Sequence, residues 1–430
     1  HRDLHSFPTR RSSDLVNYHL LDWRKKVILA RGTVERVVVG DGSVSHEVTG
    51  RGIWQIPVDC PDHASAIEVI LRTLTSTDYG VLGDLSEIAA VGHRVAHGGE
   101  RFTCSVLIDD EVVAAIRSVE HLAPLHNGPN LAGIDAARRL LPKIPQAAIF
   151  DTAFHQGMPP KAYVYPLPHE WYERHGVRRY GFHGASHLFM AKRGAVLLGK
   201  PADTVNLVTV HLGKGVSLCA IRNGRSVDTS MGMTPLEGPA MGSRCGDIDA
   251  GIFPYIMQAE QLAPKDYTSI LNQKSGLAGI AGGTGERREI LEGAAAGDVR
   301  CRLAQEIEGY RLRKYIGAYF AALGRVDALI FTSNYSDVGW SVREKALAGL
   351  EFLGIGLDRE QNRLADRDEG ETLISRQDSR VPVYAIPVAD GLVFAEDVAA
   401  ILDGGCRDHM ESDYSFGHGD FVMPWREREV

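Results

Sequence analysis

The chain has 430 residues, enough for two domains of about 200 residues each with an ample hydrophobic core. Its 44% hydrophobic and 24% charged residues are ordinary for a globular protein, and a net charge of −8 argues against nucleic acid as the main partner. The scattered cysteines favour reduced thiols, and no apolar run reaches the roughly 18 residues of a membrane span, so we expect a cytoplasmic protein.

The first 15 residues, HRDLHSFPTRRSSDL, have no apolar period and no signal-peptide core. The pattern changes at Val16, where VNYHLLDW alternates like a strand. We therefore interpret residues 1–15 as non-native, adapter-derived or disordered sequence and leave them out of the predicted fold. A genuine disordered basic arm is the alternative.

From Val16 onward, predicted strands and helices alternate. In the first half we expect strands at 16–23, 26–39, 43–56, 88–95 and 146–150, and helices at 62–74, 111–118 and 131–141. In the second half we expect strands within 205–222 and at 328–332 and 381–388, and helices at 298–323 and 342–353. Three strands followed by alternating helices and strands occur twice, which predicts an α/β fold with an internal duplication and a cleft between its halves.

The densest chemical signal lies at residues 211–249. Two apolar runs, Val205–Val210 and Val216–Ile221, flank a Gly-Lys-Gly turn, which predicts a tight β-hairpin. Glycines at such a tip let backbone N–H groups approach a phosphate closely. With Arg244 and several aspartates downstream, the segment suggests phosphoryl transfer; an ordinary glycine hairpin beside an acidic surface loop is the alternative. The predicted phosphate-binding residues are His211, Leu212, Gly213, Lys214 and Gly215.

Further polar residues stand where predicted strands end or helices begin. Arg94 follows one strand and offers a planar fork for carboxylate or phosphate, and Asp151 ends another, a usual position for a functional group. His126 precedes a predicted helix. His183 and His187, four residues apart, would suit zinc by spacing alone, but no cysteine or HExxH partner supports a metal site.

Six segments in the right order are very similar to the signature segments of the acetate kinase family, which includes propionate and butyrate kinases. They are GHRVAHGGERF, APLHNGPNLAGI, FDTAFHQGMP, YGFHGASH, VDTSMGMTPLEGPAMGSRCGDID and LNQKSGLAGI. The resemblance runs from about Val16 to about Leu402. It implies two ribonuclease-H-like domains of the sugar-kinase, Hsp70 and actin superfamily, flanking a catalytic cleft. It also implies reversible phosphoryl transfer from ATP to acetate with Mg²⁺ (or Mn²⁺), and a homodimer.

The resemblance implies domains and residue roles as well. Residues 16–150 and about 391–430 would form the N-terminal domain, and 151–390 the C-terminal domain for nucleotide binding and dimerisation. The implied catalytic residues are Asp151, His183 and Arg244. The implied substrate-binding residues are Arg94, Ala96, Leu125, His126, Phe182 and Pro235. The implied nucleotide-binding residues are the hairpin, Glu286, Arg287, Arg288, Asn334, Tyr335, Ser336, Asp337 and Val338, and the implied metal ligand is Asp390.

Three departures from the family pattern matter. The family's first-strand run Asn-x-Gly-Ser-Ser-Ser-x-Lys falls at 10–17 and does not fit, and Lys214 replaces the usual Asn. The adenosine loop at 333–338 reads SNYSDV instead of Ala-Gly-Ile-Gly-Glu-Asn. A pyrophosphate- or phosphate-using, or weakly active, paralogue is therefore the alternative function. Ala96 stands where Val is common, so we expect propionate to be used comparably to acetate, and the 404–430 tail has no assigned role.

Overall fold

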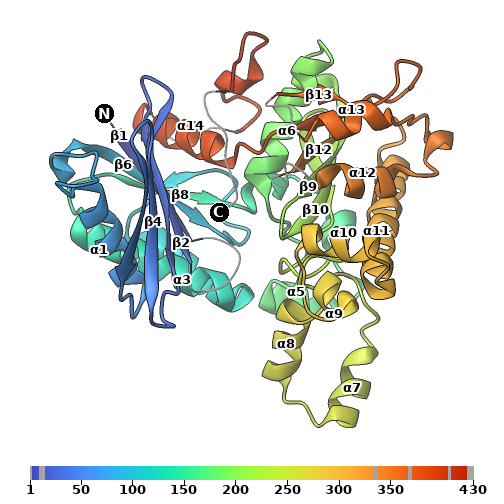
Figure 1. The fold of residues 1–430 in the computed structure, drawn as a ribbon, viewed down its shortest axis with the longest axis horizontal. Helices are drawn as coiled ribbons and strands as arrows, with labels where there is room; N and C mark the ends of the chain where they lie inside the picture. The colour runs from blue at the N-terminus through green and yellow to red at the C-terminus, as the bar shows by residue number, and fades with distance from the viewer. Residues whose placement is uncertain (1, 9–14, 334–337, 367–369, 405–407, 424–430) are drawn as a thin grey trace. The chain divides into compact units, whose positions relative to one another are not determined.

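The computed structural model describes residues 2–8, 15–333, 338–366, 370–404 and 408–423 (Figure 1). For residues 2–8, 124–125 and 333 it describes the backbone alone. The chain divides into two compact units. Unit 1 comprises His1–Gln156 and Ala389–Val430, and unit 2 comprises Gly157–Val388.

Unit 1 is built on a mixed sheet with the strand order β5-β4-β3-β2-β1-β6-β8-β7. Neighbours from β5 to β1 are antiparallel, whereas β1, β6 and β8 are parallel. The strands are β1 (Arg2–Pro8), β2 (Val16–Asp22), β3 (Val27–Glu35), β4 (Gly42–Val48), β5 (Gly52–Val58), β6 (Ile88–Val95), β7 (Val106–Leu107) and β8 (Gln146–Phe150).

Two expectations about the amino-terminal strands are wrong. We left residues 1–15 out of the predicted fold as non-native or disordered, but Arg2–Pro8 forms β1 between β2 and β6. The predicted strand at 43–56 is two strands, β4 and β5, because the chain reverses at Thr49–Arg51. Gly50 takes φ +75° in that turn, a conformation that glycine adopts without strain.

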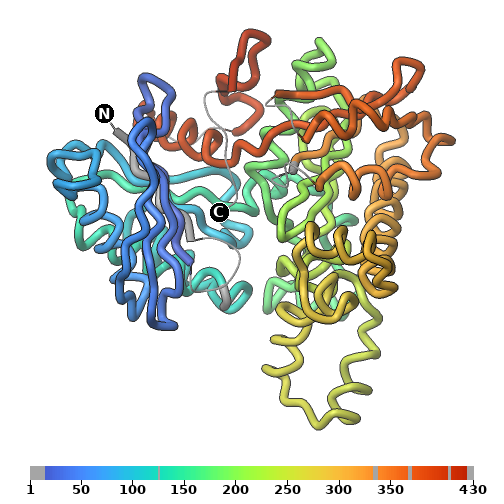
Figure 2. The backbone as a smooth tube through the Cα atoms, viewed as in Figure 1, coloured from blue at the N-terminus to red at the C-terminus, as the bar shows by residue number. Residues whose placement is uncertain are grey.

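Helices cover both faces of the sheet in unit 1. Leu20 belongs to a buried cluster with α1 side chains, and its neighbour Leu21 packs with Ala395 of α14. Successive strand residues point to opposite faces, so α1 and α14 lie on different sides. Figure 2 shows the red α14 segment beside the blue strands of the same unit, where it contacts β1, β6 and β8. The helices are α1 (His63–Leu74), α2 (Asp110–Ser118), α3 (Pro124–Leu140) and α14 (Asp390–Leu402), with 3₁₀ turns at Leu85–Glu87, Glu120–Leu122, Ala153–His155 and Ser415–Gly417.

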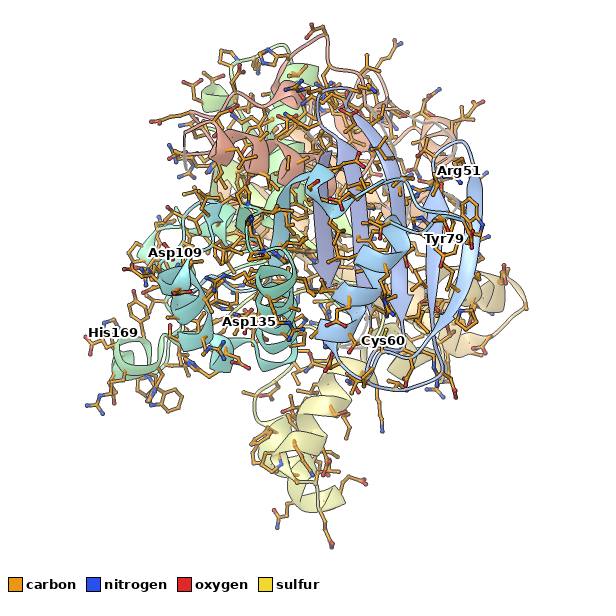
Figure 3. The ribbon with its side chains drawn as sticks, turned by 90° about the vertical axis from the view of Figure 1, so that its left-hand side faces the viewer. Arg51, Cys60, Tyr79, Asp109, Asp135 and His169 are labelled. Atoms are coloured by element: carbon orange, nitrogen blue, oxygen red, sulfur yellow. The ribbon has the colours of Figure 1, made fainter. Side chains whose placement is uncertain are left out.

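The helices α1 and α2 of unit 1 begin at side-chain caps, whereas α3 and α14 do not. The side chains of Asp62 and Asp109 accept backbone N–H groups at the starts of α1 and α2 (Figure 3 labels Asp109). We expected α3 to begin at Leu131. It begins at Pro124 and continues through Pro129, because packing against α1 and the sheet overrides the low helix propensity of this segment.

The carboxyl-terminal segment after α14 folds back onto unit 1. Asp397 of α14 accepts hydrogen bonds from Ser105 Oγ (2.5 Å) and Tyr414 OH (2.7 Å). The Phe416 ring is fully buried, and the His409 ring lies 4.9 Å from that of Phe154. Burial raises the pKa of Asp397 to about 6. Nearby, Cys104 is disulfide-bonded, so the expectation of reduced thiols is wrong at that position.

Unit 2 repeats the strand order of unit 1. Its sheet has the order β11-β10-β9-β12-β14-β13, with β9, β10 and β11 antiparallel and β9, β12 and β14 parallel. The run β11-β10-β9-β12-β14 corresponds to β3-β2-β1-β6-β8, which confirms the predicted duplicated α/β fold. The strands are β9 (Asn206–Leu212), β10 (Val216–Arg222), β11 (Arg225–Thr229), β12 (Ala328–Ser333), β13 (Thr372–Leu373) and β14 (Val383–Ile386).

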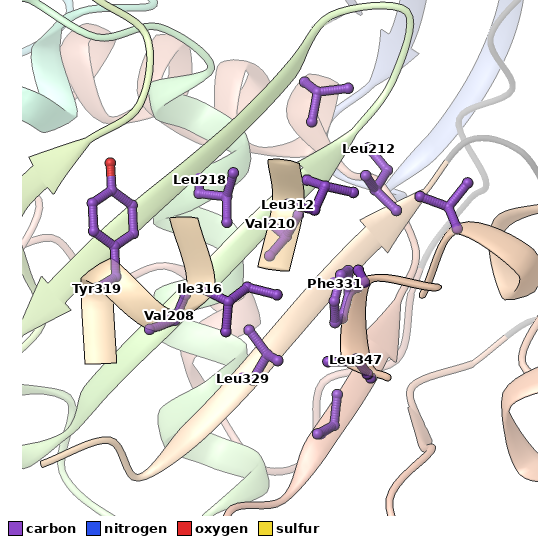
Figure 4. Close-up of a cluster of buried hydrophobic side chains, with 14 of the residues drawn as sticks. Val208, Val210, Leu212, Leu218, Leu312, Ile316, Tyr319, Leu329, Phe331 and Leu347 are labelled. Carbon is purple, nitrogen blue, oxygen red and sulfur yellow. The ribbon is translucent and has the colours of Figure 1, made fainter. Parts of the chain in front are cut away.

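The core of unit 2 lies between its sheet and α11 (Figure 4). Val208 and Leu329 of the sheet pack with Ile316 of α11. On the other face α6 approaches so closely that a Cβ on Gly194 would lie 2.9 Å from Leu207. The helices are α4 (Pro160–Tyr163), α5 (His169–His175), α6 (Gly184–Leu197), α7 (Ile252–Glu260), α8 (Pro264–Gln273), α9 (Gly276–Ala281), α10 (Arg287–Ala295), α11 (Val299–Leu323), α12 (Gly339–Leu347) and α13 (Arg359–Leu364), with 3₁₀ turns at Ala202–Thr204 and Glu351–Leu353.

Candidate active site

In unit 1, an arginine and an aspartate meet at the ends of two parallel strands. Arg94 lies near the end of β6, and Asp151 follows β8 directly. Arg94 Nε and Nη2 donate to the two Asp151 carboxylate oxygens, each at 2.8 Å. The side chains are 12% and 6% exposed. This bidentate geometry holds both groups in a fixed orientation.

The loop after β6 is held by side chains of α3 and of the turn after β8. The backbone N–H groups of Ala96 and His97 donate to the side-chain oxygens of Asn130 (3.0 Å) and Asn127 (3.1 Å). The N–H of Gly98 donates to Thr152 Oγ1 at 3.2 Å. These bonds fix the backbone that carries Ala96, which is half-buried.

Other sequence-predicted residues of unit 1 lie around these elements. His126 is half-buried in the first turn of α3, and not before the helix as we expected. The Leu125 side chain lies outside the described part of the structure. Asp390 is the first residue of α14 and is half-buried, and Phe394, one helical turn later, lies 6.0 Å below the Arg94 guanidinium.

In unit 2, the glycine hairpin between β9 and β10 has a closed tip. The N–H of Gly213 donates to the carbonyl of Gly215 at 3.0 Å. Arg287 Nη1 donates to the Gly213 carbonyl at 2.8 Å, and the same guanidinium forms a buried ion pair with Glu308. Arg287 therefore connects the hairpin tip to Glu308 of α11. Lys214 is half-buried, with Nζ 3.5 Å from Glu286.

His183 lies at the start of α6 in a left-handed backbone conformation, φ +61°. This conformation is uncommon outside glycine and is frequent at functional positions. His183 Nδ1 lies 2.6 Å from Ser217 Oγ, which in turn lies 2.9 Å from His187 Nε2. His187 Nδ1 contacts Thr209 Oγ1 at 2.8 Å, so a buried polar chain orients the His183 ring.

Arg244 and His183 flank the hairpin tip. A Cβ on Gly215 would lie 3.3 Å from both Arg244 Nη1 and His183 Nε2. Arg244 Nη1 donates to the Pro235 carbonyl at 3.2 Å. Desolvation lowers the pKa of Arg244 to about 10, and the guanidinium stays charged at neutral pH. Among the described residues, no carboxylate lies within ion-pair distance of it.

Glycines also bring two further loops against the hairpin. A Cβ on Gly242 would lie 3.2 Å from the Gly285 carbonyl and 3.7 Å from that of Lys214. The N-terminal amides of α9 bond the carbonyls of residues 241–243. The tip, the Arg244 loop and the 284–286 turn thus pack backbone against backbone, next to the Arg244 guanidinium.

The remaining nucleotide-side residues are partly described. Arg288 is exposed at the start of α10, and Val338 is buried just before α12. Asn334, Tyr335, Ser336 and Asp337 lie outside the described residues. Phe182, expected in an acyl pocket, is 1% exposed and belongs to the core of unit 2.

Several contacts of the site were not predicted from the sequence. His187 shares Ser217 with His183. Asp247, one of the aspartates downstream of the hairpin, accepts from Tyr315 OH and the Gly238 N–H. In the sequence, only the four-residue spacing of His183 and His187 indicated that these two side chains could contact the same group.

Two further observations concern the described residues of both units. No group of three or more His, Cys, Asp or Glu side chains in the described residues is arranged to hold a metal ion. No helix in the described ranges combines the length and apolar character needed to cross a bilayer.

The five-strand run shared by the two sheets, with a glycine hairpin next to an arginine and a histidine, defines a duplicated two-domain α/β fold. The sequence model of the Acetokinase family matches residues 11–396. The chain belongs to the acetokinase family. It is 58% identical to the acetate kinase of Geobacter metallireducens over 410 residues, covering 95% of this chain and 97% of that protein.

Solved structures agree with this assignment. The crystal structure of Porphyromonas gingivalis acetate kinase is 40% identical, with a TM-score of 0.86, and the match covers 93% of this chain and 100% of that one. A propionate kinase from Francisella tularensis is 32% identical, with a TM-score of 0.84, and the match covers 92% and 98%.

Proposed function

We propose that this chain is a cytoplasmic acetate kinase that transfers the γ-phosphoryl group of ATP reversibly to acetate, giving acetyl phosphate and ADP. The observation that carries the proposal is the placement of both Arg244 and His183 next to Gly215 at the hairpin tip. A desolvated guanidinium beside glycine amides is a site for a phosphoryl group. Membership of the acetokinase family supports the same reaction.

The proposed chemistry needs charge neutralisation more than a strong base. An acetate oxygen attacks the γ-phosphorus, the bond from phosphorus to the bridging oxygen breaks, and ADP leaves with the electron pair. The carboxylate is already a nucleophile, so catalysis depends on alignment and on charge spread over the phosphoryl oxygens. Arg244 and His183 supply donors for those oxygens, and the Ser217 contact fixes which edge of the His183 ring faces the tip.

The Arg94–Asp151 pair is proposed to bind and orient the carboxylate substrate. In the structure the two groups satisfy one another, so an incoming acetate would compete with Asp151 for the Arg94 fork. Asp151 would then align the reacting groups. Substrate-side roles for Ala96, Leu125, His126, Phe182 and Pro235 rest on the family resemblance.

Mg²⁺, or Mn²⁺, would accompany the nucleotide. Mg²⁺ is usually bound through one or two carboxylates together with substrate phosphates. The lack of a three-residue metal cluster among the described residues fits that mode. Asp390, half-buried at the start of α14, is the carboxylate we propose to hold it. The ion would neutralise phosphate charge.

The phosphoryl donor is tested directly by activity and binding. We expect acetyl phosphate formation from acetate and Mg·ATP, and heat of binding for ATP and ADP by isothermal titration calorimetry. Turnover or binding with pyrophosphate but not with ATP would replace ATP as the donor, the alternative suggested by the altered 333–338 sequence. No turnover with either donor would overturn the proposal.

Restoring the family's phosphate-binding run at residues 10–17 distinguishes a weakly active acetate kinase from a wrong assignment of function. We expect a variant that carries the family's Asn-x-Gly-Ser-Ser-Ser-x-Lys run at residues 10–17 to turn over faster than the chain as it stands. The relevant readout is kcat at saturating ATP and acetate. An unchanged kcat would show that this run contributes nothing here.

We propose that propionate is accepted comparably to acetate. Ala96 replaces a common Val, and the two missing carbons leave room for about one more substrate carbon, worth roughly 1–3 kcal/mol in an apolar pocket. The similarity to a propionate kinase supports this proposal. Ala96→Val should lower kcat/KM for propionate about tenfold or more while acetate is nearly unaffected. Strong acetate preference in the wild type, unchanged by Ala96→Val, would contradict it.

We further propose a homodimer formed through unit 2. Ile252, Phe253 and Tyr255 on α7 are 43%, 40% and 73% exposed, and Ile248 just before it is 41% exposed. Such a group of exposed apolar side chains is typical of an interface. Light scattering should give twice the mass of the chain, and Tyr255→Glu with Phe253→Glu should give a monomer. A monomeric wild type would refute the dimer.

A further inference from the structure

Arg179, which has no role in the proposed phosphoryl transfer, binds the loop that carries Arg244. Arg179 Nη1 donates to the backbone carbonyls of Thr229 (2.8 Å) and Ser230 (3.0 Å). Its Nη2 donates to Glu237 Oε1 at 2.6 Å. The two side chains are 16% and 31% exposed. Although burial acts against the charge, Glu237 keeps the pKa of Arg179 above its ordinary value.

Glu237 is held from its other side as well. Tyr165 OH donates to Glu237 Oε2 and also accepts the N–H of Met233 at 3.1 Å. Gly232 lies against both of these polar groups, so closely that a Cβ there would overlap the Glu237 carboxylate and the Tyr165 hydroxyl. Both carboxylate oxygens of Glu237 are therefore engaged, and the loop has one preferred path at this point.

The same pair lies next to both His183 and Arg244. Arg179 precedes His183 by four residues, and the N–H groups of Tyr180 and Gly181 between them bond the Gly232 carbonyl at 3.0 and 3.2 Å. On the other side, the Pro235 carbonyl that accepts from Arg244 lies two residues before Glu237. The Arg179–Glu237 pair thus ties the segment of His183 to the loop of Arg244.

We propose that Arg179 and Glu237 are positioning residues that set the placement of His183 relative to Arg244 at the hairpin tip, with Tyr165 fixing the Glu237 carboxylate. This inference rests on the phosphoryl-transfer roles proposed for His183 and Arg244. Neither Arg179 nor Glu237 touches substrate in this account. Loss of the pair leaves His183 and Arg244 in place but lets their separation vary, and a misplacement of about 1 Å can cost about a hundredfold in rate.

The test compares two partly buried arginine–glutamate pairs of the same unit. Arg193, on α6, donates to both carboxylate oxygens of Glu371 at 2.5 and 2.7 Å, and its side chain is 5% exposed. Its partner Glu371 belongs neither to the hairpin nor to the Arg244 loop. Arg179→Lys and Arg193→Lys keep the charge and remove the fork, so each should lower Tm by a similar amount.

We expect Arg179→Lys and Glu237→Gln to lower kcat about tenfold to a hundredfold, with KM for ATP and the calorimetric Kd for ATP within about twofold of wild type. Arg193→Lys should leave kcat within about twofold. Equal kcat losses in Arg179→Lys and Arg193→Lys, or losses that track Tm alone, would overturn the positioning role.

Two outcomes separate this inference from the proposed function. If the wild type has no kinase activity, the proposed function fails first. If the wild type is active and Arg179→Lys, Glu237→Gln and Tyr165→Phe retain its kcat, the inference alone fails. If Arg179→Lys does not fold, Tyr165→Phe serves as the test, because it removes one hydroxyl and leaves the Arg179–Glu237 ion pair intact. An unchanged kcat in both Tyr165→Phe and Glu237→Gln would then refute the positioning role of the pair.

Discussion

The buried ion pair between Arg287 and Glu308 allows stability and hairpin support to be separated. Arg287 Nε donates to Glu308 Oε1 at 2.7 Å, and both side chains are 4% exposed. Removing one partner leaves a buried charge without compensation, which costs about 3–5 kcal/mol, whereas replacing both by apolar side chains is often nearly neutral. We therefore expect Arg287→Met and Glu308→Leu each to lose about 3–5 kcal/mol of unfolding free energy, and the double variant to recover most of it.

Activity should follow a different pattern from stability. Arg287 Nη1 also donates to the Gly213 carbonyl in the hairpin tip, and this bond is absent from the double variant. Urea denaturation of the three variants gives the free energies, and kcat at saturating substrates gives the activity. The double variant should be stable but slow. If the double variant loses as much stability as the two single variants together, the expected cost of an unpaired buried charge is refuted. If it keeps the wild-type kcat, the proposal that Arg287 supports the hairpin tip is refuted.

Two further predictions concern crowding at the tip and the pH dependence of stability. Gly215→Ala places a Cβ 3.3 Å from Arg244 Nη1 and His183 Nε2, so these groups must shift by a few tenths of an ångström. Steady-state kinetics should therefore show a fall in kcat of about tenfold or more. The control Gly317→Ala, which has nothing within 4 Å of the new atom, should leave kcat unchanged. The raised pKa of Asp397 in the folded state, about 6 against 3.8, means that the folded protein holds a proton that the unfolded chain releases, so wild type should lose stability relative to Asp397→Asn as pH rises through this window. The difference should change by about 1.4 kcal/mol between about pH 5 and about pH 7.5 in denaturation curves, and a difference that is constant or of opposite sign would contradict the buried-acid assignment.

Elements with continuous apolar runs and clear ends were predicted from the sequence. The strands β6 and β8 have the predicted limits, Ile88–Val95 and Gln146–Phe150. The helix predicted at 298–323 is α11 with Asp298 as its N-cap. In these segments the local pattern and the tertiary environment agree, because both buried strands are mostly apolar and an Asp side chain satisfies the first helical amides.

Features that depend on distant partners were not predictable. The strand β1 has no apolar alternation of its own, and its place is defined by pairing with β2 and with β6, more than 80 residues later. The contacts of Arg179 and the polar chain from His183 to Thr209 depend on segments that meet only in the folded unit. Residue type and spacing indicated which segments carry polar groups, but not which of those groups touch.

The helix α14 gives unit 1 an unusual order of assembly. Unit 1 comprises residues 1–156 and 389–430, so its sequence is interrupted by the whole of unit 2. The helix that packs on β1, β6 and β8, and that brings Phe394 beneath Arg94, is synthesised only after the whole of unit 2. Domains generally fold as their chains emerge. Here a unit whose strands are synthesised before unit 2 can be completed only after it, and Arg94 acquires its contact with Phe394 only then.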